Sequence, residues 1–273
     1  MALEGKAKAT IANYLRAPHS LMLHCNKLPE ECTVDEIKAF LIHQRDSLNY
    51  SASTVNMRFC GLKHYFRNVS IRPDLVVAIP NPRIQKFQTE ILTSEELNIL
   101  YRSCKDMRQV IVISLMFECG LRSREVVRLR IGDFNKEHRS ITIRNSKGNK
   151  TRVVPYSHSL RDDLKKYCKA IGAIPTGTLI ESYKYKGAPL TTGGIQHIFK
   201  GVVKRSRLKE RIHPHTIRHT FAVHYINNGG SIFRLQQILG HKYITTTLHY
   251  LKYAKIPEGL DISNLDIFRA RGK

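Results

Sequence analysis

Apolar side chains in the first third of the chain recur at the spacing of one helix face. Thr33 and Glu36 form the sequence of a capping box, which predicts that a helix begins there. The apolar side of this predicted helix consists of Ile37, Phe40, Leu41 and Leu48. A second helix is predicted after residues 51–54, with an apolar stripe at i, i+4, i+7 and i+11 made of Val55, Phe59, Leu62 and Phe66. The pattern predicts a helical first domain.

The helical pattern stops between residues 79 and 90. Pro80, Asn81 and Pro82, with the polar stretch that follows, cannot hold a regular helix. A new capping box then starts at Thr93 and Glu96. We therefore expect a helical domain over residues 1–80, a linker over 81–91, and a second domain over 92–273 that ends in a tail over 254–273.

The second domain mixes helical and strand patterns. Residues 140–144 and 152–155 are predicted strands, and the Gly and Asn residues of 145–150 suit the hairpin turn between them. Ser123 is the predicted N-cap of a short helix through Arg130. Further helices are expected over 94–104, 107–119, 158–171, 191–206, 214–228, 231–239 and 244–252. The fold class is thus mostly α, with a small β-sheet in the second domain.

The charge of the chain indicates which class of partner it binds. Its 273 residues include 45 Lys and Arg against 22 Asp and Glu, which gives a net charge of +23. So basic a chain needs a polyanionic partner, and nucleic acid is the usual one, although a ribosomal or RNA-binding protein would have the same charge. There is no apolar run of 18 residues and no secretory leader pattern, so we expect no membrane span and a cytoplasmic location.

Three polar residues follow the apolar stripe of the second predicted helix on its neighbouring face. They are Asn56, Lys63 and Arg67. A solvated helix flank and contact with DNA phosphates explain such a row equally well in this basic chain, so these residues are DNA-binding candidates. The six cysteines contain no CxxC pair, and we expect free thiols that pack in the interior.

The C-terminal half holds the residues that could break a phosphodiester without a metal. That reaction needs a nucleophile, cations that hold the non-bridging oxygens, and an acid for the leaving oxygen. Tyrosine, arginine and lysine suit these tasks in turn. His215 and Arg218, three residues apart after Pro214, would share one face of a helix.

Taken singly, the candidates have plainer interpretations. Arg122 suits a surface position, Lys147 a solvated turn, and Tyr250 a core position, with Tyr253 as a rival for any special role. A metal site is a further alternative, because His215 and His219 are four residues apart. Zinc hydrolases with two histidines at this spacing need Glu directly after the first histidine, and this chain has Thr216 there. Nothing in the sequence supplies a paired carboxylate for a metal, and no Walker or GxGxxG sequence is present, so we expect no metal, no cofactor and no small-molecule substrate.

The order of the motifs decides between these interpretations. Along the chain stand Gly-Leu-Arg at 120–122 with Glu125, Lys-Gly-Asn-Lys at 147–150, Arg-Val-Val-Pro at 152–155, His-Thr-Ile-Arg-His at 215–219, Leu-Gly-His at 239–241, and Tyr250. In this order the sequence resembles the tyrosine recombinase (phage integrase) family, in detail over about 92–253. A weaker resemblance extends to the family's preceding helical DNA-binding domain.

The resemblance implies a role for each matching residue. Arg122 and Arg218 would clamp the scissile phosphate, and Lys147 would protonate the leaving 5′-hydroxyl, with Lys150 as a rival. His215 would accept the proton of the nucleophile and His241 would hydrogen-bond the phosphate. Tyr250 would form the 3′-phosphotyrosine bond, with Tyr253 as the alternative nucleophile. Glu125 would support the site without doing chemistry.

The resemblance also implies an activity and an assembly. We expect a site-specific DNA recombinase in which two domains clamp double-stranded DNA, and four copies exchange strands at two sites through a Holliday junction. A type IB topoisomerase and a non-catalytic site-specific DNA-binding protein are the alternatives. The chain lacks the sequence for an extra arm-binding domain, which favours a simple recombinase. The tail over 254–273 is expected either to fold back or to dock on a neighbouring copy.

Overall fold

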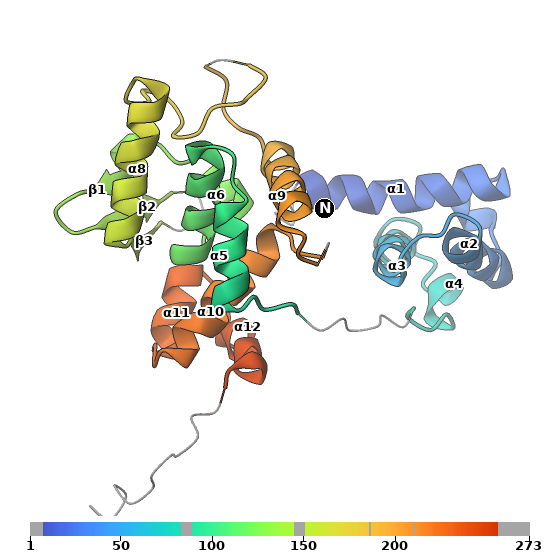
Figure 1. Ribbon diagram of the computed structural model, residues 1–273. Coiled ribbons are helices and arrows are strands. Elements are labelled where there is room, and N and C mark those ends of the chain that lie inside the picture. Colours follow the sequence, from blue (N-terminus) through green and yellow to red (C-terminus); the bar gives the residue numbers. More distant parts are fainter. Residues whose placement is uncertain (1–7, 83–88, 145–150, 186, 210, 256–273) are drawn as a thin grey trace, which may run out of the picture. The chain divides into compact units, whose positions relative to one another are not determined.

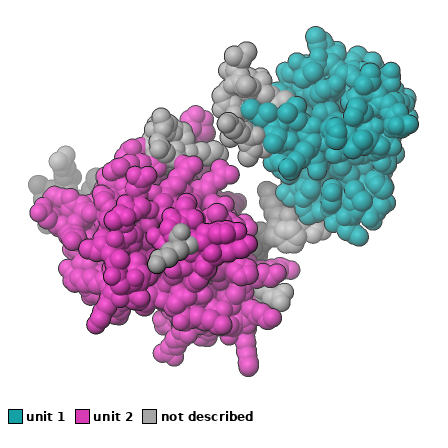
Figure 2. Space-filling view, turned by 90° about the horizontal axis from the view of Figure 1, so that it is seen from above, with its two compact units in different colours: residues 1–88 teal, residues 89–273 magenta. Residues whose placement is uncertain are grey.

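The computed structural model describes residues 8–82, 89–144, 151–185, 187–209 and 211–255. Contacts divide the chain into two compact units, unit 1 at Met1–Gln88 and unit 2 at Thr89–Lys273 (Figure 2). The fold is mostly helical with one small sheet, which confirms the predicted fold class (Figure 1). None of the helices among the described residues has both the length and the apolar character needed to span a membrane.

Unit 1 is a small helical bundle. Its elements are α1 (Lys8–Cys25), the 3₁₀ turn η1 (Pro29–Glu31), α2 (Val34–Asp46), α3 (Ala52–Asn68) and the short α4 (Asp74–Val77). Both predicted starts are confirmed, because Thr33 closes a capping box with Glu36 at α2 and Ser51 caps α3. The apolar stripe of α3 is buried along its whole length.

One residue of the predicted apolar side of α2 was misplaced. Helix α2 ends at Asp46 with Ser47 as its C-cap, and Asn49 then takes a left-handed backbone conformation with φ of 53°. Leu48 therefore lies beyond the helix, with 47% of its surface exposed. The prediction failed because helical spacing was extended past the point where the chain turns.

Unit 2 begins with helices that lead into the sheet. These elements are α5 (Ser94–Arg102), α6 (Met107–Glu118), α7 (Ser123–Val126), the 3₁₀ turn η2 (Ile131–Asp133), β1 (Phe134–Asn135), β2 (Ser140–Ile143) and β3 (Arg152–Pro155). The sheet is antiparallel in the order β1-β2-β3, with Ile141 opposite Val154. β1 was not predicted, because two residues are too few to show alternation.

The rest of unit 2 is helical and covers this core. Its elements are α8 (His158–Ile171), α9 (Thr192–Ser206), α10 (Pro214–Asn227), α11 (Ile232–Leu239), α12 (Ile244–Leu248) and the 3₁₀ turn η3 (His249–Tyr253). Ile141, Ile143 and Val154 of the sheet share one buried cluster with residues of α6 and α8. A smaller cluster joins α10, α11 and Tyr250.

Two predicted helices of unit 2 need correction. The helix expected from Ser123 to Arg130 ends at Val126, and its N-cap is Arg122. The chain leaves the helix because the Leu129 carbonyl pairs with the Leu179 N–H at 2.6 Å, a contact remote in sequence. The helix expected over 244–252 is α-helical only as far as Leu248 and continues as the 3₁₀ turn η3; α12 itself contains three consecutive threonines, which have low helix propensity.

Candidate active site

A buried carboxylate gathers two arginines at the start of α7. Glu125 accepts from Arg152 at 2.7 and 2.8 Å, from the Arg122 guanidinium at 3.0 Å, and from the Arg122 backbone N–H at 2.8 Å. Burial opposes ionisation of this carboxyl group. The hydrogen bonds and charge of Arg152, followed by those of Arg122, outweigh burial and hold its pKa at about 2.

A third arginine, Arg218 on α10, is fixed by main-chain carbonyls. Its guanidinium donates to the carbonyls of Gly120 and Leu239, and it lies 4.0 Å from the Glu125 carboxylate. Gly120 has φ of +59°, and a Cβ there would meet the Phe221 ring at 2.6 Å, so glycine is required to present this carbonyl. Burial and the charge of Arg122 lower the pKa of Arg218 to about 9, which leaves it protonated near neutral pH.

The turn between α11 and α12 brings a histidine to the arginines. Gly240 ends α11 in a left-handed conformation, and its carbonyl lies 3.4 Å from the Arg122 guanidinium. His241 follows, with Nε2 at 3.4 Å from Arg218 and Nδ1 at 2.9 Å from the Thr247 hydroxyl. Burial, then the charges of Arg218 and Arg122, lower the pKa of His241 to about 4, so its ring is neutral near pH 7.

Tyr250 on η3 lies inside this group with only 5% of its surface exposed. Its hydroxyl is 3.1 Å from His219 Nδ1, and its ring stacks on His241 at 6.1 Å with an interplanar angle of 18°. Burial raises the pKa of Tyr250, while the positive charges of Arg218 and Arg122 act in the opposite direction. Burial thus disfavours ionisation of the Tyr250 phenol, and the two arginines favour it.

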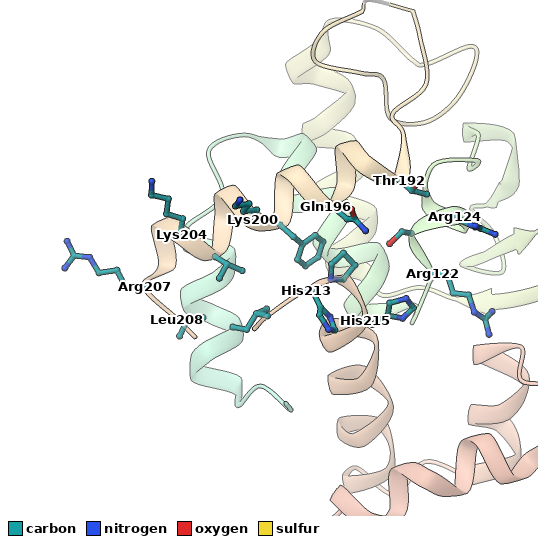
Figure 3. A pocket seen from close by; sticks show the side chains of 15 residues that line it. Arg122, Arg124, Thr192, Gln196, Lys200, Lys204, Arg207, Leu208, His213 and His215 are labelled. Carbon is teal, nitrogen blue, oxygen red and sulfur yellow. The ribbon is translucent and has the colours of Figure 1, made fainter. Parts of the chain in front are cut away.

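His215 occupies a different place on α10 from His219. It is exposed and lines a groove of about 1000 Å³ along α9, which Arg122 and Arg124 also line (Figure 3). Loss of surrounding water, followed by the charges of His213, Arg218 and Arg122, lowers the pKa of His215. Further along the groove α9 contributes Gln196, Lys200 and Lys204, and Arg207 follows the helix end (Figure 3).

Among the described residues that line the groove, none is Asp or Glu and five are Lys or Arg: Arg122, Arg124, Lys200, Lys204 and Arg207. One end of this basic groove lies where Arg122 and His215 meet. Such a surface attracts a polyanion and leads it to the arginine cluster.

Comparison with known proteins agrees with this geometry. The model of the phage integrase family matches residues 90–255, and that of the phage integrase N-terminal SAM-like domain matches residues 1–73. The chain belongs to the phage integrase family. A tyrosine recombinase of Pseudothermotoga lettingae is 31% identical over 223 residues, which cover 80% of this chain and 76% of that protein. Tyrosine recombinase XerA of Pyrococcus horikoshii is 29% identical over 253 residues, covering 92% of this chain and 85% of that protein.

Solved structures show the same fold for this integrase-family chain. The crystal structure of XerA recombinase is 25% identical, covers 100% of this chain and 95% of that chain, and has a TM-score of 0.55. A lambda integrase dimer bound to a COC′ core site is 21% identical and covers 96% of this chain and 77% of that chain. Its TM-score of 0.78 supports the shared fold.

The structure brings five of the six predicted catalytic residues into one region of unit 2: Arg122, His215, Arg218, His241 and Tyr250. Lys147, and its rival Lys150, lie outside the described residues. Tyr253, the alternative nucleophile, instead accepts a 3.4 Å hydrogen bond from the Thr89 N–H.

The predicted DNA-binding residues lie on α3 of unit 1. Arg67 is exposed and Asn56 is half-buried. Lys63 donates to the Asn81 side chain at 2.8 Å and lies 4.5 Å from the centre of the Phe59 ring. The charge of Lys63 is therefore partly occupied by its own unit, and contact with DNA remains a prediction for all three.

Two residues of the site had no predicted role. Arg152 belonged to a quoted motif, but nothing in the sequence indicated its pairing with Glu125. His219 attracted attention only through its spacing from His215, which was weighed as a metal pair. His219 and Tyr250 belong to two separate motifs and are 31 residues apart, so nothing in the sequence indicated that they are in contact.

Proposed function

We propose that this chain is a site-specific tyrosine recombinase, which cleaves and rejoins DNA through a covalent 3′-phosphotyrosine bond at Tyr250. The observation that carries the proposal is the convergence of Arg122, Arg218 and His241 on the buried Tyr250 side chain. Cations and a nucleophile at one place are what attack on a phosphodiester requires.

The arginines would hold the non-bridging oxygens of the scissile phosphate. Their forks are oriented before DNA arrives, Arg122 by Glu125 and Arg218 by two carbonyls. Preorganised cations stabilise the charge that develops in the transition state, and each contact is worth roughly 3 kcal/mol or more. His241 would donate a hydrogen bond from Nε2 to the same phosphate. The Thr247 hydroxyl can donate to Nδ1, which leaves the ring proton on Nε2 for this bond.

The reaction would then proceed in two balanced halves. The Tyr250 oxygen gives its proton to a neighbouring histidine and bonds to phosphorus as the bond to the 5′ oxygen breaks, and Lys147 protonates that leaving oxygen. The tyrosyl bond retains the energy of the phosphodiester, so attack by a 5′-hydroxyl from the same or another strand rejoins DNA without ATP.

The basic groove along α9 is the proposed DNA surface of unit 2. Exposed Lys200, Lys204 and Arg207 would contact phosphates, and the side-chain amide of Gln196 would be the candidate for contact with a base edge. In unit 1 the proposed DNA contacts are Asn56, Lys63 and Arg67 on α3.

The proposed assembly is four copies on two DNA sites, which exchange strands in pairs through a Holliday junction. A type IB topoisomerase would use the same chemistry as a single copy. Relaxation of supercoiled DNA at protein concentrations where no paired-site complex forms would favour that alternative, whereas joining of strands from two marked duplexes supports recombination.

Covalent capture tests the proposed function without knowledge of the target. The protein is incubated with a duplex library that has a randomised central segment, and DNA that stays attached to denatured protein is recovered and sequenced. We expect a defined site with the wild type and with Tyr253→Phe, and no attached DNA with Tyr250→Phe. No adduct with the wild type, or adduct lost only with Tyr253→Phe, would overturn the proposal.

A further inference from the structure

The Tyr250 hydroxyl makes its hydrogen bond with a histidine that lies outside the His-x-x-Arg motif formed by His215 and Arg218. The partner is His219, at 3.1 Å through Nδ1, and within the described part of the chain no hydrogen bond joins Tyr250 to His215. We propose that His219 accepts the proton of Tyr250 during DNA cleavage and returns it during rejoining. This inference rests on the proposed function and assigns one step of it to a different residue.

The backbone of α10 explains why the two histidines face different partners. His215 and His219 are one turn apart, with ring centres 6.4 Å from each other. His215 is exposed at the groove beside Arg122, where DNA is proposed to bind, whereas His219 is partly buried against η3. The His219 and Tyr250 ring centres are 5.5 Å apart. His215 thus faces the place proposed for the phosphate, and His219 faces the nucleophile.

The surroundings of His219 keep its ring neutral, as a proton acceptor must be. Burial has the largest effect, and the groups that face the ring add positive charge or compete for protons. These are His215 and Arg218 on α10, His213 at the N-cap of α10, and His249 on η3. Together they lower the pKa of His219 to about 4. With its proton on Nε2, the ring presents the Nδ1 lone pair to the phenol.

DNA itself would strengthen this base. A phosphate held by Arg122 and Arg218 offsets the positive charge near His219 and raises the proton affinity of Nδ1. As the Tyr250 oxygen bonds to phosphorus, its proton moves to Nδ1 of His219. The leaving 5′ oxygen takes a different proton, from the proposed acid Lys147. In the reverse step His219 returns the proton to the Tyr250 oxygen. Proton transfer would therefore be favourable only when DNA occupies the site.

A purely structural role for His219 predicts a different outcome from a proton-transfer role. His219→Asn keeps a polar group near Nδ1 but cannot take a proton. His158→Asn is the matched control, since His158 is exposed at the start of α8 and is neither among the groups that lower the pKa of His219 nor among the residues that line the groove. Both proteins are first checked for thermal unfolding and for binding to the duplex recovered by covalent capture.

The readout is the single-turnover rate of adduct formation on that duplex as pH is varied. We expect His219→Asn to be slower by about a hundredfold or more near pH 7. Its rate should rise about tenfold per pH unit, because only the ionised fraction of Tyr250 can attack, while the wild type and His158→Asn stay flat between about pH 6 and about pH 8.5. A His219→Asn rate that equals the wild type, or is lower but parallel to it across pH, would overturn the inference.

A second substrate separates the two proton transfers. In a duplex with sulfur in place of the bridging 5′ oxygen, the leaving group needs no acid, so the deficit of His219→Asn should persist. Recovery of the rate with this substrate would place His219 on the leaving-group side and overturn the inference. If His219→Asn does not fold, His219→Ala is tested with imidazole in solution, which should restore adduct formation. Failure of imidazole to restore the folded variant would contradict the role.

These outcomes are distinct from failure of the proposed function. If the wild type captures no DNA through Tyr250, the proposed function itself fails. If it does so and His219→Asn matches it, only the assignment of His219 fails.

Discussion

Replacing Glu125 by Gln tests whether one carboxylate holds the arginine cluster together. The substitution keeps the shape of the side chain and removes the only carboxylate that the described residues place against Arg122, Arg152 and Arg218. Arg152 has a side chain that is 9% exposed, and Glu125 itself is 6% exposed. The positive charges would remain without a counter-charge in a site that water barely reaches.

The expected magnitude follows from the pKa of Glu125. A shift from the ordinary value of 4.5 to about 2 corresponds to roughly 3 kcal/mol of stabilisation of the folded state. Measured losses when one partner of a buried ion pair is removed are similar, about 3–5 kcal/mol. Because the folded-state pKa is depressed, this contribution is complete above about pH 4.5 and is lost as pH falls through about 2.

Urea unfolding with hydrogen exchange, followed peptide by peptide, separates unit 2 from unit 1. At pH 7 Glu125→Gln should lower the free energy of unfolding of unit 2 by about 3 kcal/mol and leave unit 1 unchanged. The matched control is Glu118→Gln, because burial raises the pKa of Glu118 and its ionised form adds no such stability. DNA phosphates should restore part of the loss. A Glu125→Gln protein within about 1 kcal/mol of wild type would refute the role of Glu125.

Other perturbations test the rest of the site. Arg218→Lys should reduce cleavage by about a hundredfold or more while DNA binding is nearly kept, because lysine cannot reproduce a fork held by two carbonyls; equal losses in both assays would contradict this. Thr247→Val removes the hydroxyl that orients His241 and should slow adduct formation by about tenfold with no change in affinity. Lys204→Ala should lower the slope of log affinity against log salt by about one, whereas Lys169→Ala on α8 should leave it unchanged.

The parts of the fold that depend on local sequence were predictable. The capping boxes at Thr33 and Thr93 and the stripe of α3 involve residues within a few turns of one another, so pattern alone was sufficient. The end of α7 was not predictable, because it depends on pairing between Leu129 and Leu179. Likewise, the end of α2 at Asp46 was missed because the apolar spacing continues to Leu48, although Asn49 is of a type that often takes the left-handed conformation.

The candidate site shows the same division. The order of motifs was enough to select Arg122, Arg218 and Tyr250. The contacts that orient them join residues remote in sequence, such as Glu125 with Arg152 across 27 positions. Such pairings arise when helices and strands pack, and one sequence contains no record of them.

The proposed mechanism requires that Tyr250 is the residue that bonds to DNA. The most direct test is mass spectrometry of the adduct recovered from wild-type protein, after digestion of both the protein and the DNA. We predict a nucleotide attached through its 3′-phosphate to the peptide that contains Tyr250. Attachment at Tyr253, attachment through a 5′-phosphate, or an adduct on a residue other than tyrosine would contradict the account.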